Sequence, residues 1–143
     1  MKKQEYTVLI GGKKISAIFS DLAEKANGSV MLRMGDTVVL ATAVISKGKR
    51  EGIDFFPLTV DYEERFYAAG KILGSRFMRR EGRPSDTAIL SGRMVDRTIR
   101  PLFDHRLRNE VQIIITVLSM GVDDPDILAI NAASVALMIS DIP

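Results

Sequence analysis

The sequence contains no cysteine and no tryptophan, and its only histidine is His105. Without cysteine the chain cannot form disulfides, use a thiol nucleophile or hold zinc or an iron–sulfur cluster through sulfur ligands. His105 has no serine and aspartate near it in a triad arrangement, so we expect a structural or solvated role for it. A composition without cysteine suits a reducing compartment, and we expect a cytoplasmic protein.

Long apolar segments are also missing. No stretch reaches the ~18 uncharged apolar residues that cross a bilayer, so a membrane span is not expected. The basic start, MKKQEYTVLI, is followed by Gly11-Gly12-Lys13-Lys14 before any long apolar run develops. This pattern differs from that of a signal peptide, and we expect no membrane partner.

What is present is typical of one globular domain. The 143 residues are 46% hydrophobic and 27% charged, and they contain no internal repeat or low-complexity linker. Residues 1–143 are therefore expected to form a single domain. The formal net charge of +2 is too small by itself to indicate a nucleic-acid partner.

The first third of the chain has the pattern of two β-hairpins. Strands are expected at Tyr6–Ile10 and Lys14–Phe19 around a glycine turn, and at Ser29–Met34 and Thr37–Ile45 around Gly35-Asp36. Because Thr37–Ile45 is apolar on both faces, we expect a central strand that is covered on both sides.

The remaining pattern predicts an α+β fold. The expected elements are a charged loop over 47–52, a strand at Phe55–Val60, an irregular segment from Asp61 to Pro84, a helix from Asp86 to about Arg100, a strand at Val111–Leu118 and a helix from Asp126 to about Ile139. Pro57 suits an edge strand, and the element order predicts one right-handed crossover. The last helix is apolar all round, so we expect the chain to be the N-terminal portion of a larger fold.

Charge is distributed unevenly along the chain. The segment from Arg76 to Arg108 holds nine arginines, no lysine and four acidic residues, so its local charge is +5, whereas the remainder carries −3. The planar guanidinium binds phosphate in a bidentate manner and stacks on bases, which an ammonium group cannot do. This segment is therefore the best candidate for binding nucleic acid.

Within that segment an irregular stretch combines an aromatic side chain with arginines. Phe77 and Met78 are followed by Arg79 and Arg80, and Arg83 lies close behind. An aromatic ring for the bases and positive charge for the backbone are the components of a single-strand binding site. A solvated basic loop with Phe77 packed into the core explains the same pattern, and both interpretations stay open.

Three further arginines share one stripe of the predicted helix. Arg93, Arg97 and Arg100 recur at the spacing that places side chains on one helix face. We favour ion pairs with carboxylates of the same domain or of a neighbouring subunit. The alternative is a second surface, extended by Arg76, that contacts phosphate or RNA.

No catalytic or metal site is predicted from the residues. Gly11-Gly12-Lys13-Lys14 lacks the spacing and the following Ser or Thr of a phosphate-binding P-loop. The run Asp123-Asp124-Pro125-Asp126 is better explained as the cap of the last helix than as a cation site. No acid/base pair and no cluster of metal ligands stands out in the chain.

The most distinctive segments are RFYAAGK, from Arg65 to Lys71, and GSRFMRREGRPSDTAILSGRMVDRTIRPLF, from Gly74 to Phe103. Four others support them, namely GSVMLRMGDTVVLATAVISK, FFPLTVDYEER, NEVQIIITVLS and DPDILAINAASVAL. Together these segments resemble the bacterial polynucleotide phosphorylases, and specifically the first half of their first ribonuclease-PH-type core domain. The resemblance covers nearly the whole chain.

The resemblance implies a ribonuclease-PH-like fold, also described as ribosomal protein S5 domain 2-like, in a phosphate-dependent 3′→5′ exoribonuclease. Inorganic phosphate would attack the 3′-terminal phosphodiester of single-stranded RNA and release nucleoside diphosphates. The family pattern also implies a homotrimer, Mg²⁺ held by residues outside this chain, and a connection to the RNA-degradation machinery. It places catalysis in the second core and gives the first core a pore loop that grips RNA, carried over here onto Phe77, Met78, Arg79 and Arg80, with Arg83 alongside.

Three positions depart from the family pattern. Met78 stands in place of a second aromatic residue, Arg76 is an additional base in the loop, and Thr87 occupies the place where single-core ribonuclease PH enzymes have a phosphate-contacting arginine. The last difference fits a core that is inactive alone. Two alternatives stay open, a single-core enzyme of the ribonuclease PH type that trims tRNA 3′ ends and a non-catalytic RNA-binding module.

Overall fold

The computed structural model describes residues 3–72, 74 and 82–143. Its strands are β1 (Lys3–Ile10), β2 (Lys13–Ser20), β3 (Gly28–Met34), β4 (Thr37–Lys49), β5 (Leu58–Glu64) and β6 (Asn109–Ser119). Its helices are α1 (Asp86–Ile99) and α2 (Pro125–Met138), with short 3₁₀ turns η1 (Asp21–Ala23), η2 (Phe66–Ala69) and η3 (Arg100–Leu102). The predicted α+β fold is confirmed.

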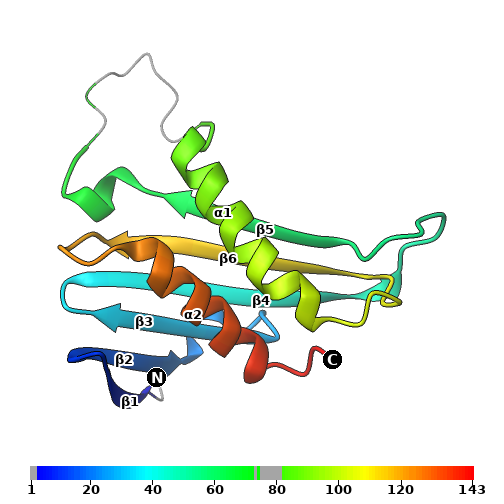
Figure 1. Ribbon diagram of the computed structural model, residues 1–143, viewed down its shortest axis with the longest axis horizontal. Helices are drawn as coiled ribbons and strands as arrows, with labels where there is room; N and C mark the ends of the chain where they lie inside the picture. The colour runs from blue at the N-terminus through cyan, green and yellow to red at the C-terminus, as the bar shows by residue number, and fades with distance from the viewer. Residues whose placement is uncertain (1–2, 73, 75–81) are drawn as a thin grey trace.

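The six strands form one sheet in the order β1-β2-β3-β4-β6-β5, as Figure 1 shows. All neighbours are antiparallel except β5 and β6, which run parallel because α1 connects them. The predicted hairpin at the start is present. Its turn pairs Ile10 with Lys13 around Gly11 and Gly12, whose φ values of 57° and 79° suit glycine.

Both helices lie on the same face of the sheet (Figure 1). The core between the helices and the sheet is built from alternate residues of the central strands. Examples are Val39 and Ala41 on β4 and Ile113 and Ile115 on β6, all of which are fully buried. Val44, on the other face of β4, is 38% exposed, and no described helix packs on that face. The prediction that this strand is covered on both sides is therefore wrong for the described part of the chain.

The last helix packs closely because its inner side carries small residues. Ala129, Ala132, Ala133 and Ala136 are fully buried against β3 and β4. A side chain at Gly28 would place its Cβ only 2.0 Å from the carbonyl oxygen of Ala136, so the two backbones are in direct contact there. Asp124 caps this helix by accepting a hydrogen bond from the Asp126 amide, as the sequence predicted.

Two predicted boundaries differ from the structure. The predicted charged loop over 47–52 overlaps β4, which continues to Lys49. The strand predicted at Phe55–Val60 is instead Leu58–Glu64, so the first residues of the predicted irregular segment are in a strand. Hydrogen bonds to β6, which pair Leu58 with Val111 and Glu64 with Val117, outweigh the polar character of this stretch. Pro57 does precede an edge strand, as predicted.

The crossover from β5 through α1 to β6 is left-handed, so the right-handed prediction is also wrong. In Figure 1 both strands run to the left, α1 passes in front of them, and β6 lies below β5. The hand follows from two constraints of this fold. β6 must lie between β4 and β5, and α1 must cover the face where Val111 and Ile113 are buried.

Among the described residues no helix is long and apolar enough to cross a membrane.

Candidate functional site

The start of α1 is fixed by Ser85 at the edge of the sheet. The Ser85 hydroxyl oxygen accepts a hydrogen bond from the Ala88 amide at 3.0 Å and donates one to the Glu64 carboxylate at 2.7 Å. Ser85 therefore caps the helix and ties it to the end of β5. This contact also positions the predicted site residue Arg83, which lies two residues before Ser85.

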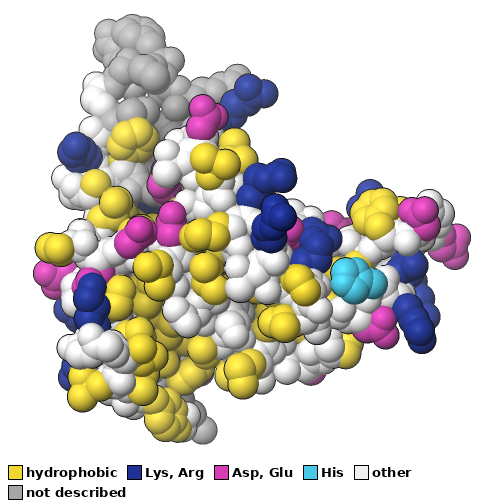
Figure 2. Space-filling model, in the orientation of Figure 1, with side chains coloured by type: hydrophobic (Ala, Val, Ile, Leu, Met, Phe, Trp, Pro, Cys, Tyr) yellow, Lys and Arg dark blue, Asp and Glu magenta, His cyan; other side chains and the backbone are white. Residues whose placement is uncertain are grey.

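The spacing along α1 predicts a core-facing side of Ala88, Val95, Ile99 and Leu102, and this is wrong for Leu102, which follows the helix and is 80% exposed. Ala88, Val95 and Ile99 are buried, and Gly92 lies over β5, where an added Cβ would be 3.4 Å from the Val60 carbonyl oxygen. Arg93 and Arg97 are exposed on the outer side. Figure 2 shows Lys and Arg side chains gathered over the middle of this helix. The helix is thus held by an apolar face and presents a basic one.

Arg100 behaves differently from the other two arginines of the stripe. Its guanidinium bonds the Asp96 carboxylate at 2.6 and 3.0 Å and donates to the carbonyl oxygens of Phe56 and Leu58 at 3.2 and 3.1 Å. These bonds join the end of α1 to the start of β5. For Arg100 the structure therefore contains the ion pair within the domain that we favoured for the stripe, whereas Arg93 and Arg97 form no ion pair with another described residue.

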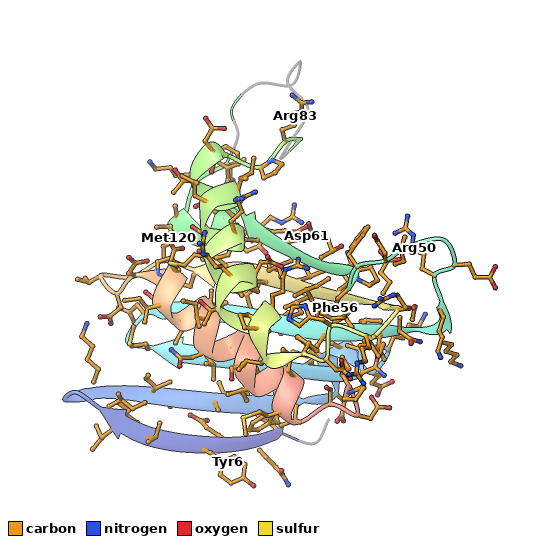
Figure 3. The ribbon with its side chains drawn as sticks, turned by 45° about the vertical axis from the view of Figure 1, so that its right-hand side comes forward. Tyr6, Arg50, Phe56, Asp61, Arg83 and Met120 are labelled. Carbon is orange, nitrogen blue, oxygen red and sulfur yellow. The ribbon has the colours of Figure 1, made fainter. Side chains whose placement is uncertain are left out.

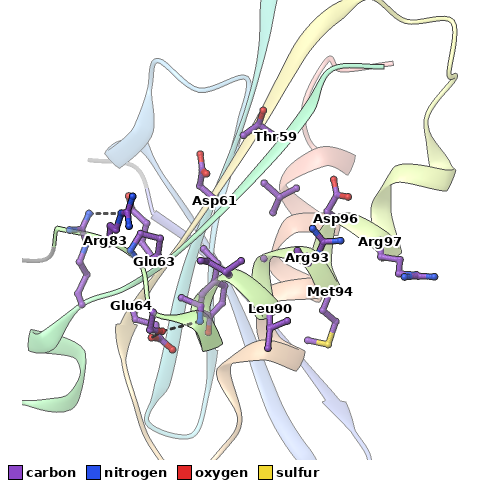
Figure 4. Close-up of a pocket in the computed structure, with 18 of the residues that line it drawn as sticks. Thr59, Asp61, Glu63, Glu64, Arg83, Leu90, Arg93, Met94, Asp96 and Arg97 are labelled. Carbon is purple, nitrogen blue, oxygen red and sulfur yellow. Dashed lines mark hydrogen bonds and ion pairs between the residues drawn. The ribbon is translucent and has the colours of Figure 1, made fainter. Parts of the chain in front are cut away.

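A groove of about 1420 Å³ follows the free edge of β5 (Figure 4). Its basic lining residues are Arg65, Lys71, Arg83, Arg93, Arg97 and Arg100. The acidic residues of the groove are bonded within the described chain. Asp61 accepts from Gln112, Glu63 pairs with Arg65, Glu64 accepts from Ser85, and Asp96 pairs with Arg100. Because six basic residues face four acidic ones, the described lining of the groove carries a net positive charge.

The remaining predicted loop residues lie outside the described part of the chain. Arg76, Phe77, Met78, Arg79 and Arg80 belong to this group, so their predicted roles stay predictions. Arg83 is described and exposed, and Figure 3 shows it beyond the start of α1. Thr87, which stands where related enzymes have an arginine, lies in the first turn of α1, and its carbonyl oxygen accepts from the Ser91 hydroxyl.

Sequence reasoning missed several residues of the groove. Phe66 and Lys71 line it beside Arg83, although neither was singled out. The adjacent aromatic and basic residues of RFYAAGK are the pattern that could have identified them. The described residues contain no group of three His, Cys, Asp or Glu side chains that could hold a metal ion.

Tyr62 was also missed, and it is the most perturbed acid in the described chain. Its side chain lies under α1, where only 4% of the residue is exposed. Burial raises the pKa of the Tyr62 phenol well above its ordinary value, and the carboxylate of Asp126 raises it further. Asp126 in turn accepts a hydrogen bond of 2.8 Å from Ser91. This polar cluster joins β5, α1 and α2 beneath the groove.

Comparison with known proteins assigns the fold to a family. Residues 11–143 match the model of the 3′ exoribonuclease family, domain 1, and the chain belongs to this family. Two solved structures share its fold. These are an exosome of Archaeoglobus fulgidus with RNA bound to the active site, with a TM-score of 0.63 and 23% identity, and rice Rrp46, with a TM-score of 0.62 and 19% identity. Each covers 99% of this chain, which in turn covers 52% and 57% of theirs.

Closer relatives are the bacterial polyribonucleotide nucleotidyltransferases. The protein of Pelotomaculum thermopropionicum is 56% identical over 95% of this chain, and that of Pseudothermotoga lettingae is 58% identical over 92%. The Thermotoga maritima protein is 54% identical over 100% of this chain. The chain spans only 18–20% of the length of these relatives. The ribonuclease-PH-like fold and the resemblance to this enzyme family are therefore confirmed.

Proposed function

We propose that this chain is the N-terminal, RNA-gripping segment of a phosphate-dependent 3′→5′ exoribonuclease. The enzyme would degrade single-stranded RNA, including mRNA, to nucleoside diphosphates, and this segment would bind the RNA without catalysing the reaction. The observation that carries the proposal is the identity of 54–58% to polyribonucleotide nucleotidyltransferases along nearly the whole chain. It favours this function over a single-core tRNA-trimming enzyme.

The basic residues of the groove supply the physical mechanism for binding. Arg83, Arg93 and Arg97 are exposed and form no ion pair with another described residue, so their guanidinium groups are available for phosphate oxygens. Phe77 and Met78 would press on bases, while Arg79 and Arg80 would hold the backbone beside them. Arg76 would add a further phosphate contact.

The proposal extends to the whole enzyme that would contain this segment. Inorganic phosphate would be its co-substrate, and Mg²⁺ would be bound by residues outside this chain. The subunits would form a homotrimer in the cytoplasm, in contact with other RNA-degradation proteins. The family membership of residues 11–143 supports these proposals. This chain would contribute RNA binding through the groove at the edge of β5.

The gripping role can be tested by replacing Arg79 and Arg80 with alanine. Binding to a fluorescent oligo(A) of about ten nucleotides is measured by anisotropy at several salt concentrations. Loss of two phosphate contacts on a single strand should flatten the slope of log affinity against log salt by about 1.4 and weaken binding at low salt. An unchanged affinity and an unchanged slope would contradict the gripping role.

The matched control is the double variant Arg50→Ala with Arg106→Ala. Both arginines are exposed and neither lines the groove at the edge of β5. Figure 3 shows Arg50 on the right of the molecule, well away from Arg83 at the top. Because this variant removes the same charge elsewhere, it should leave the salt slope close to that of the unmodified chain. An equal loss in both double variants would indicate only a general effect of net charge.

A further inference from the structure

The short turn η2 holds two aromatic side chains at the surface. Phe66 is 44% exposed and Tyr67 is 54% exposed. The turn itself is fixed, because Ala68 is buried and its carbonyl oxygen accepts the Met120 amide at 2.9 Å. Gly70, with φ of 66°, closes the turn by donating to the Tyr67 carbonyl oxygen. The aromatic rings are therefore displayed from a rigid base, and little ordering would be needed for them to bind a ligand.

Only one of the two rings faces the groove. Phe66 lines it together with Lys71, Arg83 and Met120, whereas Tyr67 is not among the lining residues. Backbone contacts place these residues at one end of the groove. The Lys71 amide donates to the Phe66 carbonyl oxygen at 3.0 Å, and the Met120 amide bonds the carbonyl oxygen of the adjacent Ala68. Arg83 is two residues before Ser85, which bonds Glu64 at the end of β5.

The charges around Phe66 favour an anionic ligand. Glu63 pairs with Arg65, and Glu64 accepts a hydrogen bond from Ser85, so the three cations Arg65, Lys71 and Arg83 outnumber these two carboxylates in the lining. Lys71 and Arg83 are exposed and form no ion pair with another described residue. An aromatic side chain and two such cations in the lining of one groove match a nucleotide, which has an apolar planar base and a charged phosphate.

We propose that Phe66 is a stacking platform for one base of single-stranded RNA, with Lys71 and Arg83 contacting the adjoining phosphates. The strand would then continue along the groove toward Arg93 and Arg97. This inference rests on the proposed function, because it takes RNA as the ligand. It adds a base contact on a rigid part of the fold, separate from the predicted loop contacts of Phe77 and Met78.

The test compares Phe66 variants of this chain in the oligo(A) anisotropy assay. Phe66→Ala should weaken binding about tenfold, within the range measured for loss of one stacked base, while leaving the salt slope unchanged. Phe66→Tyr keeps the ring and should bind within about twofold of the unmodified chain. Phe66→Leu keeps an apolar side chain of similar size without a π face and should resemble Phe66→Ala. Equal affinity of the Leu and Tyr variants would overturn the stacking role.

Two controls separate stacking from other effects. Tyr67→Ala removes an equally exposed ring from the same turn outside the groove and should change the affinity by less than about twofold. An abasic ribose-phosphate chain of the same length has no base to stack, so it should bind the Phe66→Ala variant and the unmodified chain equally. A Phe66→Ala penalty that persists on the abasic chain would overturn the proposal.

The outcomes also separate this inference from the proposed function. If the Arg79 and Arg80 variant loses affinity while Phe66→Ala does not, the platform is wrong and the gripping loop stands. If the unmodified chain shows no oligo(A) binding at low salt, both proposals fail. If Phe66→Ala changes the sedimentation coefficient but not RNA affinity, the ring belongs to an interface between protein subunits, which also overturns the platform.

Discussion

Tyr62 is a titratable group whose environment makes the stability of this domain depend on pH. Its phenol oxygen is buried and makes no hydrogen bond to another described residue. Because burial and the nearby Asp126 carboxylate disfavour the phenolate, the pKa of Tyr62 is higher in the folded state than in the unfolded state. The unfolded chain therefore loses this proton first as the pH rises above about 10, and the folded state loses stability from there upward.

The prediction is that Tyr62→Phe resists alkali better than the unmodified chain. Near pH 7 the two proteins should differ by about 1 kcal/mol or less in unfolding free energy, since the lost hydroxyl has no partner. Above pH 10 the unfolding free energy of the unmodified chain should decrease relative to that of Tyr62→Phe by up to about 1.4 kcal/mol per pH unit. Urea denaturation at a series of pH values measures this difference. Parallel pH profiles for the two proteins would show that Tyr62 does not titrate as described.

A matched control uses a tyrosine that is exposed. Tyr67 is 54% exposed, whereas only 4% of Tyr62 is exposed. Tyr67→Phe should therefore follow the alkaline profile of the unmodified chain. Lysines that lose their charge at high pH are the same in all three proteins, so their contribution cancels in the comparison.

The arginines show how far individual side chains could be predicted. The spacing of Arg93, Arg97 and Arg100 correctly predicted a shared helical stripe, but the helix ends at Ile99 and Arg100 turns back onto the sheet. Its partners Phe56 and Leu58 lie more than forty residues earlier in the chain. Contacts across that separation depend on where β5 lies in the sheet, which no local pattern contains.

At the level of the elements, the local sequence pattern predicted which helices and strands form better than it predicted their ends or their arrangement in the fold. The hairpin glycines, the Ser85 and Asp124 caps and the alternation in β6 are each decided by neighbours in the sequence. The extension of β4 to Lys49 and the shift of β5 depend instead on hydrogen bonds to β6. The left-handed crossover depends on which face of the sheet needs cover.

The contact between β3 and α2 gives a prediction at this scale. Gly28→Ala would place a Cβ 2.0 Å from the backbone oxygen of Ala136 and 2.9 Å from the Ser140 side chain. Because the first of these atoms belongs to a helix backbone, the helix as a whole must shift. We expect a loss of about 3 kcal/mol in unfolding free energy, measured by urea denaturation.

The control for this substitution lies on a neighbouring strand. Gly48, near the end of β4, has no heavy atom within 4 Å of the position that a Cβ would occupy. Gly48→Ala should change the unfolding free energy by about 0.5 kcal/mol or less. Should Gly28→Ala prove as stable as Gly48→Ala, α2 would not pack on β3 as closely as described.

For the whole molecule, the sequence shows the separation of charge, but it does not show the groove. The Arg76–Arg108 segment correctly indicated the basic face of α1, where Arg93 and Arg97 are exposed. Phe66 and Lys71 join that face only because η2 is bonded to the end of β6 and lies at the edge of the sheet. A groove formed by separate segments is a property of the fold rather than of any one segment.

The same molecule should bind RNA and yet be inactive by itself. Phosphorolysis needs groups that position phosphate and neutralise charge at the scissile bond, usually with a metal ion, and the described residues contain no group of His, Cys, Asp or Glu side chains that could hold one. We predict that this chain, given poly(A), inorganic phosphate and Mg²⁺, releases no ADP above the enzyme-free blank in a chromatographic assay. The full-length Thermotoga maritima relative is the positive control, and oligo(A) binding by the same sample confirms that the chain is folded. ADP release by the 143-residue chain alone would place a catalytic site within it and refute the binding-only role.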